Sequence, residues 1–142
     1  MSGLERIRRH LRREDGVAAL EFAIVSMVFL VLLYGILTYG FIYGMDQSMN
    51  HAAEEGARSA ISKTTEADAI TFAKQTAYDR MSSFHPALQM SDITATVDDC
   101  DTSYRCITVT IAYPWNTRPI IPAFPGLPTP SQLIAEATIQ LT

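Results

Sequence analysis

The chain has 142 residues, of which 48% are hydrophobic, and a formal net charge of −4 at pH 7. This length leaves room for a membrane helix and one modest core, but not for a second large domain. After Met45, eleven Asp or Glu residues outnumber six Lys or Arg residues, so we expect no nucleic-acid partner for this acidic part.

The amino-terminal segment 1–16 is basic. Its charge comes mainly from five arginines, Arg6, Arg8, Arg9, Arg12 and Arg13. Acids such as Asp46 appear soon after the apolar run that follows, whereas the next basic residue is Arg58. The positive-inside rule therefore predicts a cytoplasmic amino terminus and an exported remainder.

The segment 22–45 contains no charged residue and exceeds the ~20 residues with which an α-helix crosses a bilayer. A secretory signal peptide is the alternative, but its apolar part is usually about 7–15 residues long and ends at an Ala-x-Ala-like site. Neither property fits, so we predict a transmembrane helix here.

Glu21 stands at the start of this apolar run, five residues after Gly16. A carboxylate inside a bilayer costs about 2.5–3.5 kcal/mol on insertion scales and usually has a functional partner. Alternatively, Glu21 could simply reach headgroup water. The segment from Gly16 to Phe22 resembles a class III signal, the cleavage site of type IV pilins and pseudopilins, and this combination favours the functional interpretation.

Helical periodicity continues beyond the apolar run and predicts a first helix over residues 17–61, about 65 Å long at 1.5 Å per residue. The apolar stripe after Met45 comprises Met49, Ala52, Ala53, Ala57, Ala60 and Ile61. Glycines, Gly56 among them, make local bending plausible. Gly40 and Gly44 form a GxxxG motif, which lets helices approach closely but is common in membrane helices.

Residues 62–142 are predicted to form a periplasmic α+β domain. A second helix is expected over 66–82, with Thr65 as its N-cap. Alternating apolar and Thr residues predict two strands around Ile93–Val97 and Ile107–Ile111, and a third over 135–141. Together they predict a three-stranded antiparallel sheet that buries one face against a helix.

Cys100 and Cys106 bracket the turn between the first two strands. A disulfide there would persist only in an oxidising space such as the periplasm, and it would stabilise the fold by about 2 kcal/mol. Two cysteines without further ligands make no structural zinc site, and His10, His51 and His85 lie in three different regions. Nearby acids could hold Ca²⁺, but acids at a solvated turn are ordinary; they are Asp98, Asp99 and Asp101.

The connection from Pro114 to Pro130 is rich in proline, which excludes a central strand and favours an extended surface loop. It also contains Trp115, Ile120, Ile121, Phe124 and Leu127. We expect these residues to fold back as a lid on the small core, with partner contact at the loop tip as a second hypothesis.

Three segments together resemble TadE-like minor pilins of the tight-adherence (Tad, or Flp) pilus system. They are Gly16-Val17-Ala18-Ala19-Leu20-Glu21-Phe22-Ala23, Tyr34-Gly35-Ile36 and Ala52-Ala53-Glu54-Glu55-Gly56-Ala57-Arg58. The resemblance implies that a prepilin peptidase cuts between Gly16 and Val17, and that Glu21 and Phe22 serve assembly. It also implies an inner-membrane, single-pass protein that acts with other minor pilins, the major pilin and the assembly platform.

Two other classes share this topology. One is a membrane-anchored periplasmic binding or scaffold module, which would keep residues 1–16 and tolerate replacement of Glu21. The other is a pseudopilin of the type II secretion kind, which would be cut at the same place. The sequence contains no Ser-His-Asp, Cys-His, HExxH or phosphate-loop arrangement, so we expect neither an enzyme nor a cofactor or metal site.

Overall fold

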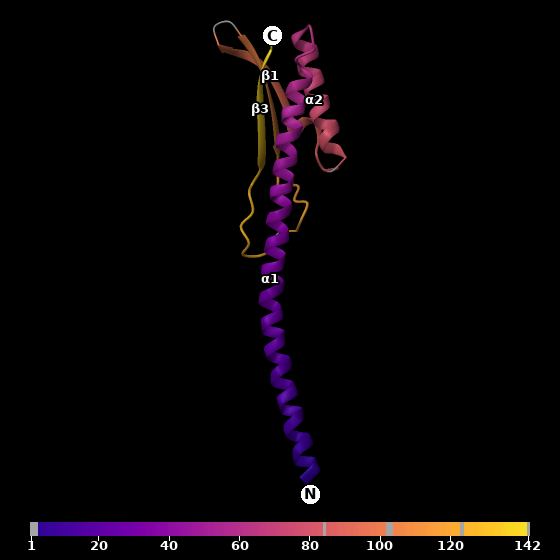
Figure 1. The fold of residues 1–142 in the computed structure, drawn as a ribbon, viewed down its shortest axis with the longest axis vertical. Helices are drawn as coiled ribbons and strands as arrows, with labels where there is room; N and C mark the ends of the chain where they lie inside the picture. Colours follow the sequence, from indigo (N-terminus) through magenta and orange to yellow (C-terminus); the bar gives the residue numbers. More distant parts are fainter. Residues whose placement is uncertain (1–2, 84, 102–103, 123, 142) are drawn as a thin grey trace. The chain divides into compact units, whose positions relative to one another are not determined.

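The computed structural model describes the backbone of residues 3–83, 85–101, 104–122 and 124–141, and side chains from Gly16 onward except that of Asp101. It is an α+β structure in which two helices precede a three-stranded antiparallel sheet (Figure 1). The chain divides into two compact units, residues 1–40 and residues 41–142. This fold class confirms the prediction.

Helix α1 spans Gly3–Ser59 and contains most of the basic leader as well as the apolar run. Within it, Gly16–Ser59 is long and apolar enough to cross a membrane. The helix ends two residues before the expected Ile61, and a turn follows in which the amide of Ala60 donates to the carbonyl of Ala57. Ile61 is consequently 44% exposed, so its placement on the buried stripe was wrong.

The part of α1 that belongs to the second unit buries one apolar stripe. Its members follow the helical spacing and are Ile42, Met45, Met49, Ala52, Ala53 and Ala57; the buried Ala60 follows just past the helix end. This stripe joins buried residues of the second helix and of the sheet in a single core. Helical periodicity thus predicted the buried face correctly as far as the helix extends.

Helix α2 spans Glu66–Ser82 and is capped as expected. The Thr65 hydroxyl accepts a hydrogen bond of 3.2 Å from the amide of Asp68, which satisfies one of the free amides at the helix start. Its buried face consists of small residues and one methionine, Ala69, Ala73, Ala77 and Met81. The small residues allow α2 to lie close alongside α1 within this unit (Figure 1).

The sheet has the order β1-β2-β3, formed by Ile93–Asp101, Tyr104–Tyr113 and Leu133–Leu141. A short 3-10 turn, η1 at Met90–Asp92, leads into β1. The register places Ile93 and Ala135 opposite Ile111, on the face that packs against the helices. The opposite face is rich in threonine; Thr108 and Thr138, for example, share a hydrogen bond of 2.9 Å. The predicted alternation of buried and solvated residues is confirmed.

The proline-rich connection between β2 and β3 is only partly a lid. Trp115 is 2% exposed and belongs to the core, and Ile121 packs against the same core. Ile120 and Phe124, however, are 37% and 40% exposed. The lid prediction is therefore correct for Trp115 and Ile121 and wrong for Ile120 and Phe124.

Candidate processing and assembly site

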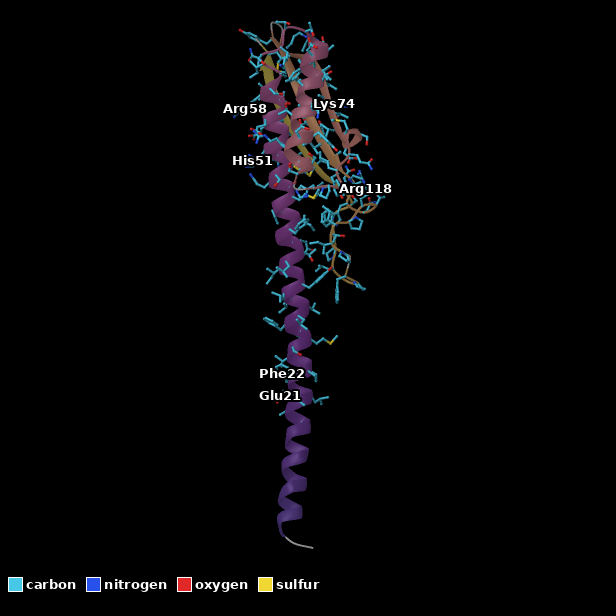
Figure 2. All side chains as sticks on the ribbon, turned by 90° about the vertical axis from the view of Figure 1, so that its right-hand side faces the viewer. Glu21, Phe22, His51, Arg58, Lys74 and Arg118 are labelled. Atoms are coloured by element: carbon cyan, nitrogen blue, oxygen red, sulfur yellow. A yellow bond between two sulfur atoms is a disulfide. The ribbon has the colours of Figure 1, made fainter. Side chains whose placement is uncertain are left out.

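The predicted processing and assembly residues all lie on α1. Val17 and Glu21 are four residues apart and therefore share one face of the helix, one turn from each other. Glu21 and Phe22 follow one another along the helix (Figure 2). Both side chains are exposed, as are those of Val17 and Leu20.

Glu21 is an exposed acid in an exposed apolar surface. The large apolar residues around it are also exposed, from Val17 and Leu20 before it to Phe22, Ile24 and Val25 after it. In the part of the chain that the structure describes, Glu21 has no ion pair or side-chain hydrogen bond. A cationic group that pairs with it in lipid must therefore come from outside this set of residues.

Gly16 has no structural role that would require glycine. A Cβ atom added there would meet nothing within 4 Å, and Gly16 lies inside a helix, where glycine costs about 1 kcal/mol relative to alanine. Gly40 and Gly44, the GxxxG pair, are equally open. The described fold therefore gives no packing reason for glycine at position 16.

The cysteine pair lies at the hairpin turn of β1 and β2. The Cα atoms of Cys100 and Cys106 are 5.5 Å apart, and their sulfur atoms are at disulfide distance. Asp98 pairs with Cys106 in the strand register, and the sheet is irregular between Asp99 and Asp101. The bridge thus links the two strands beside the turn.

The acids at this turn do not come together as a metal site among the described residues. Asp99 lies 3.8 Å from the Arg105 guanidinium, and the side chain of Asp101 lies outside the described residues. Arg105 pairs more closely with Glu66 at 2.8 Å, and this hydrogen bond and charge raise the pKa of Arg105. The two described acid side chains at this turn, Asp98 and Asp99, are both exposed.

The predicted histidines are also apart. His51 is exposed on α1, where its Nε2 atom lies 3.1 Å from Gln47 Nε2. His85 is only 6% exposed, and its Nδ1 atom has no hydrogen-bond partner among the described residues. Its ring meets that of Phe41 edge-on, with centroids 6.2 Å apart. Because this burial removes water from the imidazole, the pKa of His85 is lowered.

Two contacts between α1 and α2 could not be anticipated from the sequence. Gly56 faces α2 so closely that an added Cβ would lie 2.7 Å from the Ala73 carbonyl oxygen. Arg80 of α2 pairs with Glu55 of α1, with a hydrogen bond of 2.7 Å from Nη2 to Oε1. The alanines of α2 recur every four residues, and this spacing was the only available signal that another helix packs there.

Sequence analysis also missed the contacts of Arg118, which lies near the start of the proline-rich loop. Its guanidinium pairs with Asp92 at 2.5 Å and donates to the Ala87 carbonyl at 2.7 Å. Its own carbonyl accepts the Tyr113 hydroxyl at 2.5 Å. Burial raises the pKa of Tyr113, a shift that the nearby Arg118 charge opposes and Asp92 reinforces. Arg118 thereby fixes the start of the proline-rich loop (Figure 2).

These features define a class of protein: a chain with one helix suited to span a membrane, followed by a small α+β unit. Residues 16–58 match the family model described as TadE-like protein. The match confirms the resemblance seen in the residues and associates the chain with Tad pili. It covers less than a third of the chain and includes Gly16, Val17, Glu21 and Phe22. No curated protein and no solved structure matches the chain.

Proposed function

We propose that this chain is a minor pilin, or pseudopilin, of the Tad (Flp) pilus system. It acts as a structural subunit rather than an enzyme. The basic leader stays in the cytoplasm, α1 anchors the subunit in the inner membrane, and residues 62–142 lie in the periplasm. There the subunit takes part in the assembly or initiation of a pilus used for surface adhesion.

Proteolytic cleavage creates the cationic group that pairs with Glu21. A prepilin peptidase hydrolyses the amide bond between Gly16 and Val17, which leaves a carboxylate on Gly16 and a new α-amine on Val17. The match over 16–58 and the open surface at Gly16 support this step. A pocket that admits only a residue without a side chain explains why glycine stands at a helical position where the fold does not need it.

The observation that carries the proposal is the exposed Glu21 carboxylate, without an ion pair among the described residues, on an apolar helix surface. After cleavage Glu21 lies in the first turns of the new helix, where the helix dipole favours an anion. In lipid its burial is offset when it pairs with the α-amine of a neighbouring subunit. Only one axial offset between two helices brings these charges together, so pairing sets the register of assembly. Phe22 then packs against the neighbouring helix.

The direct test is the mass of the mature protein extracted from membranes of cells that contain an active prepilin peptidase. We expect an amino terminus at Val17. Replacing Gly16 with phenylalanine should block cleavage and pilus formation together, whereas Gly40→Phe, at an equally open glycine of the same helix, should leave cleavage intact. A mature terminus at Met1 or Ser2, or normal cleavage of Gly16→Phe, would overturn the processing step.

A further inference from the structure

The loop between β2 and β3 carries no charge over a long stretch. Arg118 is the last charged residue before it and Glu136 the first after it. Several of its apolar residues are exposed: Pro119, Ile120, Pro122, Phe124, Pro125 and Gly126. An uncharged apolar surface on a domain that is otherwise acidic marks a contact with something other than water.

The base of this loop is fixed by hydrogen bonds and an ion pair. The amide of Asn116 donates to the carbonyl of Ser131 at 3.0 Å, which closes the loop across its base. On one side of this closure, Arg118 is fixed by Asp92 and by the Tyr113 hydroxyl. The loop therefore projects from a fixed base.

The tip of the loop is shaped by a tight turn. The amide of Leu127 donates to the Phe124 carbonyl at 3.0 Å, and Gly126 between them has a φ of 92°. Proline followed by a residue with positive φ is the signature of a type II turn. The turn presents the half-exposed Phe124 on a preformed surface, so little ordering is required when the surface is covered.

The base of the loop lies at the level where the apolar run of α1 ends. Trp115 contacts Phe41 of α1, with ring centroids 6.4 Å apart. Phe41 precedes Asp46, the first charge after the uncharged run, by five residues, or about 7 Å along the helix. Tyr43 and Phe41 are both partly exposed at this level, which is typical of the aromatic belts at membrane–water interfaces.

We infer that the loop segment 119–132 is a second membrane contact, which inserts Ile120 and Phe124 into the outer interface of the bilayer that α1 crosses. This inference rests on the proposed membrane anchoring. A lipid surface fits better than a protein partner because the segment offers no charge to specify one, and because Trp115 ties its base to the end of the apolar run. Ile134, which is 51% exposed, lies opposite Ala112 and two residues before Glu136 on the outer sheet face, and we expect it to contact water.

The test uses the full chain in vesicles of phosphatidylethanolamine and phosphatidylglycerol. Single cysteines replace Ile120, Phe124, Ile134 or Leu30 in separate variants, and each carries an environment-sensitive fluorophore. The parent chain, with Cys100 and Cys106 joined, serves as the unlabelled control. Lipids with a nitroxide on the acyl chain report contact with the bilayer, and iodide reports contact with water. We expect nitroxide lipids to quench the fluorescence of the labels at positions 120, 124 and 30. We expect iodide to quench the label at position 134.

Three other outcomes are informative. If the labels at 120 and 124 are quenched by iodide like the label at 134, the loop lies in water and the inference is wrong. If they are shielded from both quenchers, the loop is covered by protein, which overturns the lipid contact in favour of a subunit contact. If the label at Leu30 also escapes nitroxide lipids, the anchoring by α1 fails, and the proposed function falls with the inference.

Discussion

Gly56 is the residue at which the packing of the two helices leaves no room for a side chain. The nearest atom to an added Cβ is a backbone oxygen, that of Ala73, and the Ala77 methyl follows at 3.0 Å. Neither can rotate away, so a methyl group at Gly56 must move a helix. The glycine that seemed a point of bending is therefore a point of contact.

We predict that Gly56→Ala destabilises the protein. Overpacking costs about 1–3 kcal/mol, which outweighs the roughly 0.5–1 kcal/mol that alanine gains over glycine in a helix. Gly44→Ala is the matched control, because a Cβ there meets nothing within 4 Å. Denaturant unfolding of the full chain in detergent, followed by the fluorescence of Trp115, measures both. Equal stability of the two variants would contradict the close contact.

His85 makes the stability depend on pH. Burial lowers the pKa of His85 below 6.5 in the folded state, so the unfolded chain binds more protons and stability rises with pH in this range. We predict constant stability above about pH 7 and a loss as the pH falls below the ordinary histidine pKa of about 6.5. The loss between pH 7 and 5 should diminish in His85→Phe and persist in His51→Gln, which changes an exposed ring. An identical pH profile in both variants would rule out this role.

At the scale of elements, the hairpin of β1 and β2 depends on a covalent closure. We predict that replacing Cys100 and Cys106 together with serine lowers the free energy of unfolding by about 2 kcal/mol, because a loop this short loses little chain entropy when it is closed. The reduced parent protein should unfold like the double variant. Unchanged stability, or free-thiol labelling of both cysteines in the native exported protein, would contradict the predicted bridge.

The spacing of apolar residues along the sequence was enough to predict the buried faces of the helices and strands. The stripe of Met45, Met49 and Ala53 has helical spacing, and the alternation of Ile107, Val109 and Ile111 with threonines has strand spacing, so both faces could be predicted. The contact of Trp115 with Phe41 could not, because it joins residues more than seventy positions apart and depends on how the loop folds. Proline residues show that a segment is a loop but not which of its side chains turn inward.

For the candidate site, too, the sequence predicts what depends on local motifs and not what depends on the fold. A local motif predicts roles for Gly16, Val17, Glu21 and Phe22, because the peptidase signal and the buried-charge argument depend only on neighbours in the sequence. The Arg118 network and the exposure of Ile120 and Phe124 require the three-dimensional fold. Long-range ion pairs such as Arg80 with Glu55 leave no mark in a single sequence, since exposed arginines and glutamates are common on any helix.

At the scale of the whole molecule, two features of the chain point to a membrane environment. The anionic Glu21 lies at the start of the apolar run, and the uncharged loop lies at the level where that run ends. Under the proposed function, Glu21 pairs with the α-amine of a neighbouring subunit, since the described part of this chain offers Glu21 no ion pair. The loop requires only lipid. We propose that such a subunit stays in the bilayer until a neighbour supplies the cation.

The most direct test of this account replaces Glu21 with alanine in cells that assemble the pilus. We predict that the variant is still cleaved to a Val17 terminus but no longer supports filaments or surface attachment. Glu21→Gln, which keeps the shape and removes the charge, should behave in the same way, and Glu54→Ala, an exposed acid on the same helix, should behave like the parent. Filaments and attachment at parental levels in Glu21→Ala would contradict the central claim.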